Sequence, residues 1–185
     1  MREPINVSGM VLSASPVGEY DKRVVILTRE LGKITAFARG ARRMKSPLMA
    51  VSNPFVFGEF QVYEGRDSYT LSGANIKEYF LDLAQMQPGV YYGFYFLELA
   101  EYFGQEGNDE TQMLNLLYVT MNAIRRGKQD LRLIRCIFEL RTITISGEAP
   151  QMFSCMECGT KENLTVFSLR DSAHGSLMVF PQFWQ

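Results

Sequence analysis

The sequence is poor in the residue patterns that catalysis usually requires. It contains one histidine, His174, in 185 residues. There is no Gly-Lys-Ser/Thr loop to cradle phosphates and no Gly-x-Ser-x-Gly nucleophile turn. No group of carboxylates has a spacing that suggests acid–base work or Mg²⁺ binding. We therefore expect that the protein is not an enzyme.

Long apolar runs and paired cysteines are also scarce. The longest uncharged stretch, Leu83–Leu97, is broken by Gln, Pro and Gly. It is shorter than the roughly 18 apolar residues that a membrane span needs. No apolar run follows Met1, so we expect no secretory signal. Three Cys do not suit a disulfide framework, and together these absences predict a soluble cytoplasmic protein.

Charge is divided unevenly along the chain, although the formal net charge is only −1. Residues 1–80 hold 11 Lys and Arg against 8 Asp and Glu, whereas residues 81–185 hold 8 against 12. Such a difference fits a part of the protein that faces a polyanion, but it also arises by chance in short segments. The charge balance leaves both readings open.

Residues 1–77 read as short strands and turns without a long helix. Five candidate strands are indicated by β-rich runs at Val7–Ser13, Arg23–Thr28, Ile34–Ala38, Phe55–Val62 and Tyr69–Ser72. Gly58-Glu59 is a candidate bulge within the fourth run. A small barrel removes exposed strand edges, so an OB-fold is expected, with an SH3-like barrel as the alternative. Core positions are predicted at Val25, Leu27, Ile34 and Phe57.

Helical spacing replaces the strand pattern in residues 78–150. It begins near Asn75, continues through an aromatic run at Tyr91–Phe103, and stops at Gly127 and Gly147. Asp109 and Asp130 are candidate N-caps for two further helices. The second of these carries apolar residues at helical spacing, namely Leu131, Ile134, Ile137, Phe138 and Ile145. The expected fold is α+β and multidomain, with a helical bundle in residues 78–150 and a partial zinc-finger-like segment in residues 151–185.

A basic stretch between the third and fourth candidate strands points to nucleic acid. Arg39, Arg42, Arg43 and Lys45 lie within seven residues, and no acid lies between Glu30 and Glu59. Cations in a barrel loop neutralise phosphates without reading sequence, although charge runs are often only solvated loops. Lys33 is a fifth candidate DNA-binding residue. Bases also need aromatic faces, and the candidates on strands are Phe37, Phe60, Tyr63 and Tyr69.

The pair Cys155 and Cys158 has the spacing of half a tetrahedral zinc site. His174 is a possible third ligand, and Cys136 is expected on the core side of a helix. A second Cys-x-x-Cys pair is absent from the sequence. Zinc is therefore a possible cofactor with an incomplete ligand set.

Several of these segments, taken in order, resemble the RecO family of DNA repair proteins. The matching landmarks are Gly9–Leu12, Gly18–Val25, Leu27–Lys33, Ala38–Arg43 with Lys45-Ser46, Pro54-Phe55, Glu98-Leu99, Phe138–Arg141, Gly147–Pro150 and Cys155–Gly159. Members with the first cysteine pair usually continue with Gly-Gly and a second pair. Here Ser172–Ser176 stands in that place and the chain stops at Gln185, which suggests a truncated or frame-altered tail.

The resemblance implies an N-terminal OB-fold, a helical domain and a zinc-finger-like element. It also implies a nucleoid-associated mediator that binds single- and double-stranded DNA, anneals strands and helps to load RecA. The partners would be RecR, RecF and single-stranded DNA-binding protein, whose acidic tail would dock on the helical domain. Two alternatives remain at this stage: an RNA-binding or translation-linked OB module, and a zinc-stabilised protein–protein scaffold.

Overall fold

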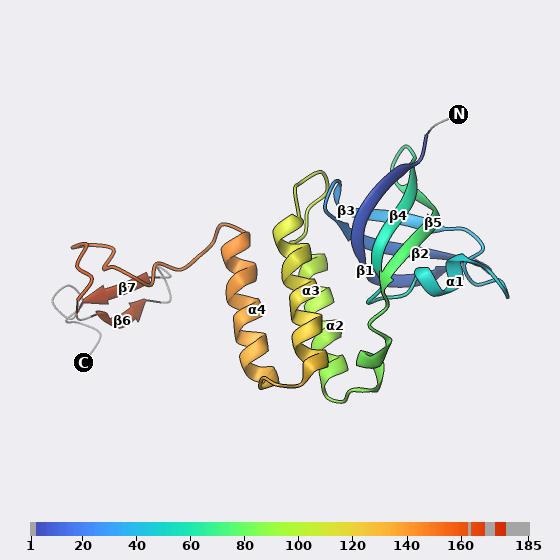
Figure 1. Ribbon diagram of the computed structural model, residues 1–185. Helices are drawn as coiled ribbons and strands as arrows, with labels where there is room; N and C mark the ends of the chain where they lie inside the picture. The colour runs from blue at the N-terminus through green and yellow to red at the C-terminus, as the bar shows by residue number, and fades with distance from the viewer. Residues whose placement is uncertain (1–2, 163, 169–172, 177–185) are drawn as a thin grey trace. The chain divides into compact units, whose positions relative to one another are not determined.

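The first part of the chain is a closed barrel of five strands (Figure 1). The computed structural model describes residues 3–162, 164–168 and 173–176. The strands are β1 (Ile5–Val17), β2 (Asp21–Thr28), β3 (Gly32–Ala38), β4 (Phe57–Glu64) and β5 (Tyr69–Glu78). They follow one another around the barrel in the order β1-β2-β3-β5-β4, and β4 pairs back with β1. The predicted OB-like barrel is confirmed, and residues 22–38 contain no helix.

All strand pairs but one are antiparallel. The exception closes the barrel, where β3 runs parallel to β5 over two residue pairs, Ala36 with Tyr69 and Phe37 with Thr70. The pairing of β4 with β5 shifts register between Phe57 and Gly58. An irregularity at this place agrees with the bulge that the sequence predicts there.

Alternation along β3 shows how the sequence builds the barrel core. Ile34, Ala36 and Ala38 are buried, and the residues between them are half-buried. They pack with apolar side chains from each of the four remaining strands of the barrel. The largest of these partners are Val11, Ile26, Phe60, Val62 and Leu71.

Three of the four predicted core residues are buried. Val25, Leu27 and Ile34 are each at most 3% exposed. Successive side chains of a strand point to opposite faces, so Val25 and Leu27 face away from the barrel core that Ile34 joins. Phe57 differs from the prediction because it is only half-buried. Its ring lies 4.8 Å from that of Tyr118, outside the barrel.

The helical pattern predicted from Asn75 onward is wrong for its first residues. β5 continues to Glu78, and Ile76 pairs with Gly58 of β4. Ile76 and Tyr79 pack against the barrel core, and this burial outweighs their helical spacing. A short 3₁₀ helix, η1 (Leu81–Gln85), follows Phe80, whose φ of 47° is left-handed.

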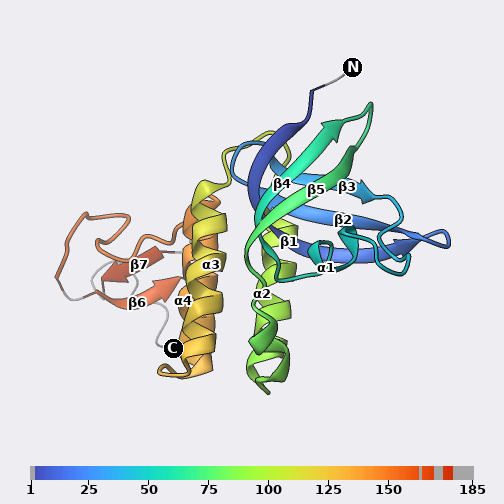
Figure 2. The same cartoon turned by 45° about the vertical axis from the view of Figure 1, so that its right-hand side comes forward.

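Three long helices follow, and a one-turn helix, α1 (Leu48–Val51), lies between β3 and β4. The long ones are α2 (Gly89–Phe103), α3 (Thr111–Arg126) and α4 (Leu131–Ile145). Asp130, directly before α4, accepts the N–H of Arg132 as its predicted capping role requires. The N-cap of α3 is Glu110, one residue after the predicted Asp109, and Asp109 accepts the N–H of Thr111 from outside the helix. Figure 2 shows α2 as the helix next to the barrel.

The helices share an aromatic core but leave much of α4 uncovered. Phe96 of α2 and Phe138 of α4 are fully buried, with ring centroids 4.5 Å apart. On α4, by contrast, three apolar side chains are half exposed: Leu133 at 52%, Ile137 at 50% and Leu140 at 51%. One face of α4 is therefore apolar and open to solvent in the described part of the chain.

The chain divides into two compact units, Met1–Thr142 and Ile143–Gln185. In the second unit, β6 (Leu164–Ser168) pairs antiparallel with β7 (Ala173–Ser176). The sequence also favours a strand at residues 177–180, which lie outside the described residues. Among the helices that the structure describes, none has the length and apolar character needed to cross a membrane.

Candidate nucleic-acid interface

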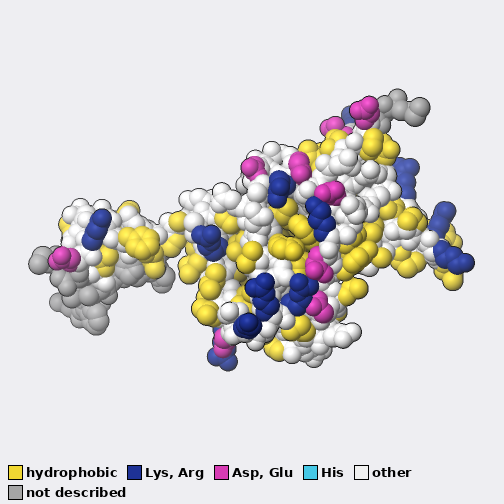
Figure 3. Space-filling view, viewed as in Figure 1, with side chains coloured by type: hydrophobic (Ala, Val, Ile, Leu, Met, Phe, Trp, Pro, Cys, Tyr) yellow, Lys and Arg dark blue, Asp and Glu magenta, His cyan; other side chains and the backbone are white. Residues whose placement is uncertain are grey.

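The basic stretch forms an exposed loop that leaves the end of β3. Arg39, Arg42, Arg43 and Lys45 are all exposed, and the loop ends at α1. Met44, between the last two cations, is 89% exposed. Figure 3 shows Lys and Arg side chains gathered at the end of the barrel that lies away from the helices.

The loop is braced against the turn between β1 and β2 rather than free. The backbone N–H of Arg42 donates to the Tyr20 carbonyl oxygen at 2.8 Å. The N–H of Gly40 donates to Asp21 Oδ1 at 2.7 Å, and the Arg42 guanidinium donates to the Gly18 carbonyl at 3.2 Å. Gly40 has a φ of 66°, a backbone conformation that favours glycine. These contacts hold the first half of the loop in place.

Positive charge is concentrated around this turn. Lys22, at the start of β2, lies near Arg42 and donates to Asn53 Oδ1 at 2.7 Å. Burial lowers the pKa of Lys22, and the positive charge of Arg42 lowers it further. Of the two acids in the turn, Asp21 is engaged with the loop backbone and Glu19 is exposed. An anion bound here would relieve the repulsion between the cations.

One aromatic ring beside the loop was not among the sequence-based candidates. The guanidinium carbon of Arg43 lies 5.0 Å from the ring centroid of Tyr20, and Tyr20 is 42% exposed. The two residues are far apart in sequence, so the pair arises only when the loop folds onto the β1–β2 turn. The one sequence signal available was an aromatic residue at a hairpin tip.

The four aromatic candidates from the sequence occupy different environments. Phe60 is fully buried, and Tyr69 packs against the barrel core. Phe60 therefore offers no open face for a base, and Tyr69 is only partly buried. Tyr63 on β4 is 37% exposed, and Phe37 on β3 is half-buried opposite Arg23.

Lys33 is not part of the basic loop. It lies at the opposite end of β3, where its ammonium group donates to the Glu101 carbonyl of α2 at 2.6 Å. Its backbone N–H also donates to the Gln105 carbonyl at 2.8 Å. Lys33 therefore joins the barrel to the C-terminal end of α2, and we leave it out of the candidate interface.

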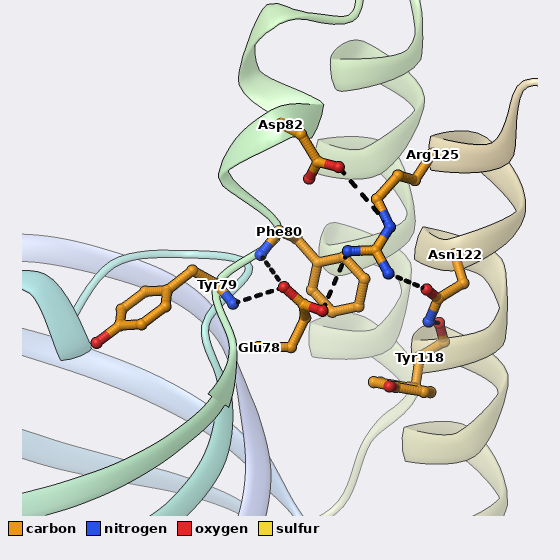
Figure 4. Close-up of polar contacts among 7 residues, drawn as sticks. All are labelled: Glu78, Tyr79, Phe80, Asp82, Tyr118, Asn122 and Arg125. Atoms are coloured by element: carbon orange, nitrogen blue, oxygen red, sulfur yellow. Dashed lines mark hydrogen bonds and ion pairs between the residues drawn. The ribbon is translucent and has the colours of Figure 1, made fainter.

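A second set of contacts, beside those of Lys33, connects the barrel to α3 (Figure 4). Glu78, the last residue of β5, accepts a hydrogen bond from Arg125 of α3 at 3.0 Å. Arg125 also donates to Asn122 Oδ1 at 2.6 Å and lies 3.7 Å from Asp82 of η1. Its guanidinium covers the ring of Phe80, at 5.2 Å from the centroid. These contacts engage Arg125 structurally, so it is a poor candidate for DNA.

A groove of about 770 Å³ opens between α3 and α4. Apolar side chains dominate its wall, including Val119, Ile134 and Ile137, of which Val119 is 64% exposed. Arg126 and Lys128 lie at its rim and are exposed. The groove thus combines an apolar surface with positive charge.

The cysteine pair has a knuckle-like backbone. The Gly159 N–H donates to the Cys155 carbonyl at 3.0 Å, and Gly159 has a φ of 71°. Cys155 is buried and Cys158 exposed, whereas Cys136 is exposed on α4 and not on its core side as predicted. Within the described residues, no three His, Cys, Asp or Glu side chains are grouped to bind a metal. The side chain of His174 lies outside them, and two thiolates alone do not complete a zinc site, so zinc binding stays a prediction.

Family models and curated relatives match most of the chain. Residues 1–80 match the family model described as "Recombination protein O N terminal", and residues 89–180 match "Recombination protein O C terminal". The DNA repair protein RecO of Alkaliphilus metalliredigens is 37% identical over 168 residues, which are 90% of this chain and 68% of that protein. Those of Caldicellulosiruptor saccharolyticus and Bacillus pumilus are 34% and 32% identical over 87% and 91% of this chain, and 65% of each relative is covered. The chain thus spans about two thirds of the length of these relatives.

Proposed function

The chain belongs to the RecO family of DNA repair proteins, and from that premise we propose that it is a non-catalytic mediator of recombinational repair that binds and anneals single-stranded DNA. The observation that carries the proposal is the braced basic loop beside the barrel. Its four cations are exposed, and backbone contacts to Tyr20 and Asp21 hold the loop in position. A loop fixed in advance loses less conformational freedom when a ligand binds.

The four cations contact phosphates rather than base edges. Each phosphate that a cation neutralises releases counterions, so affinity falls as the salt concentration rises. Each contact on a single strand adds about −0.7 to the slope of log affinity against log salt. Phosphate contacts carry no sequence information, so the affinity is the same for unrelated sequences.

The test replaces Arg39, Arg42, Arg43 and Lys45 together with Ala. A matched variant removes four exposed cations from the helical part instead, namely Arg126, Lys128, Arg132 and Arg141. Both variants change the net charge equally. Fluorescence anisotropy with labelled oligonucleotides of unrelated sequence, measured across salt concentrations, gives affinity and slope.

We expect the loop variant to bind weakly, with a slope flatter by up to about 3 units. The helix variant should keep the wild-type slope, and both should show wild-type circular dichroism. The opposite pattern would place the DNA surface on the helices and overturn the proposal for the loop. An RNA oligonucleotide of equal length tests the alternative function, because a preference for RNA requires recognition of the 2′-hydroxyl.

The partners proposed for this chain are RecR, RecF, RecA and single-stranded DNA-binding protein, acting on both single- and double-stranded DNA at the bacterial nucleoid. The acidic tail of single-stranded DNA-binding protein docks in the α3–α4 groove. Its rim carries Arg126 and Lys128, and its wall is apolar. Positive charge at the rim attracts an acidic segment, and burial of apolar side chains holds it.

The groove is tested with a labelled peptide that carries the acidic tail. Ile137→Asp introduces a negative charge into the groove, and we expect it to abolish peptide binding. Leu81→Asp is the matched control, because Leu81 is 71% exposed on η1 and does not line the groove. Equal binding by both variants would remove the groove from the proposal.

A further inference from the structure

We propose that Tyr20 is a stacking platform for a nucleobase of the bound single strand, while the neighbouring cations hold the flanking phosphates. The inference rests on the proposed single-strand binding and assigns a ligand chemistry to a residue beyond the basic loop. It starts from the packing of the Arg43 guanidinium over the Tyr20 ring at 5.0 Å.

The residue is accessible, and the turn that carries it is held in place. Tyr20 is 42% exposed. Its carbonyl oxygen accepts the Arg42 N–H at 2.8 Å, and the next residue, Asp21, accepts the Gly40 N–H at 2.7 Å. These bonds hold the turn that carries Tyr20 beside the loop that carries the cations before any ligand arrives.

The chemistry around the ring matches a nucleotide. Lys22, Arg42 and Arg43 supply positive charge within the same turn and loop. Arginine guanidinium groups are planar and weakly hydrated, so they stack on aromatic faces and still donate to phosphate oxygens. A base on the aromatic face and a phosphate on the guanidinium would satisfy both groups with one nucleotide.

Stacking on Tyr20 also suits strand annealing. A stacked base is held by its face, so its hydrogen-bonding edge stays open to a complementary strand. Every base offers such a face, and the platform is tolerant of sequence. Tight recognition of base edges would block the pairing that annealing needs.

The experiment compares an oligothymidylate with an abasic oligonucleotide of the same length and charge. Tyr20→Ala should lower affinity for the oligothymidylate about 5- to 150-fold, the range for one lost base–aromatic contact. Affinity for the abasic strand and the salt slope should not change, because no phosphate contact is removed. Tyr20→Phe should bind both strands as the wild type does.

Tyr102→Ala is the matched control and should bind both strands as the wild type does, because Tyr102 is 80% exposed on α2, outside the basic loop and the turn that braces it. A Tyr20→Trp variant supplies a direct signal, since its fluorescence should be quenched by the oligothymidylate more than by the abasic strand. The inference is overturned if Tyr20→Ala binds both strands as the wild type does. It is also overturned if both affinities fall equally, because Tyr20 would then only position Arg43. If the wild-type protein does not bind single-stranded DNA at all, the proposed function is wrong. If the wild type binds and only the Tyr20 result differs from expectation, the stacking role alone is wrong.

Discussion

The carboxylate of Glu78 accepts hydrogen bonds from the guanidinium of Arg125 and from the backbone N–H groups of Tyr79 and Phe80. Glu78 ends β5, and Arg125 belongs to the last turn of α3. One ion pair thus joins the final barrel strand to a helix 47 residues later in the sequence. Both side chains are 31% exposed, so water screens the pair only in part.

We expect Glu78→Ala and Arg125→Ala each to lower the free energy of unfolding by about 1–2 kcal/mol, because each leaves a half-buried charge without its partner. A double-mutant cycle in urea should give a coupling of about 1 kcal/mol. The pair Lys77–Glu59 is the control, since its side chains are 53% and 46% exposed. Its coupling should be under about 0.5 kcal/mol, and similar couplings for both pairs would contradict the role given to Glu78.

The same carboxylate makes the stability depend on pH. Burial raises the pKa of Glu78, but hydrogen bonds from Arg125 and the Phe80 N–H, with the charge of Arg125, bring it below the usual value. The stability it contributes is complete above the unfolded-state pKa of about 4.3 and is lost as the pH falls through the lower folded-state pKa. In urea titrations below about pH 4.3, the wild type should therefore lose stability more steeply than Glu78→Gln. Parallel curves would count against the ion pair.

Lys33 and Lys45 should respond to substitution in opposite ways. Lys33→Met removes the ammonium group that donates to the Glu101 carbonyl at the end of α2. We expect a loss of about 1 kcal/mol in the free energy of unfolding and no change in the DNA salt slope. Lys45→Met should leave stability unchanged and flatten the slope by about 0.7. A flatter slope for Lys33→Met would return Lys33 to the DNA interface.

Two glycines with a positive φ should differ sharply in their tolerance of alanine. Gly32 has a φ of 69°, and an added Cβ would collide with the Gln105 carbonyl and lie 2.9 Å from the Asn108 oxygen. Gly127 has a φ of 61° with no atom within 4 Å of that position. Gly127→Ala should therefore reduce stability by about 1–2 kcal/mol, the left-handed penalty alone. For Gly32→Ala we expect about 4 kcal/mol or more, and equal melting shifts would disprove the close approach.

The parts of the fold that depend on local sequence were predictable. Alternation in β3 and the capping carboxylate of Asp130 act over a few residues, so the sequence shows them directly. Ile76 was misassigned because pairing with β4 outweighs its helical spacing. The exposure of Ile137 was not predictable, because spacing identifies an apolar face of a helix but not whether a neighbour covers it.

The candidate site was predictable only in its charges. The cations at 39–45 are adjacent in sequence, and a loop between strands tends to be exposed. The contact of Arg43 with Tyr20 depends on how the loop folds back, and no spacing rule gives it. The hydrogen bond of Lys33 to the end of α2 was likewise out of reach of the sequence, because it joins residues 68 positions apart, and the role of Lys33 in DNA binding stays a prediction.

The short parallel seam between β3 and β5 sets the order in which the barrel can fold. β1, β2 and β3 are joined by tight turns, so their pairing closes only small loops. Pairing of β3 with β5 brings Ala36 next to Tyr69 and closes a long loop that contains the basic loop, α1 and β4. Only two residue pairs form in return for that loss of chain entropy. We therefore expect hairpin contacts to form early and closure to come late. Until that last step the basic loop and α1 link two locally formed parts, β1–β2–β3 and the β4–β5 hairpin, so a nascent protein would present its cations before it has a complete barrel.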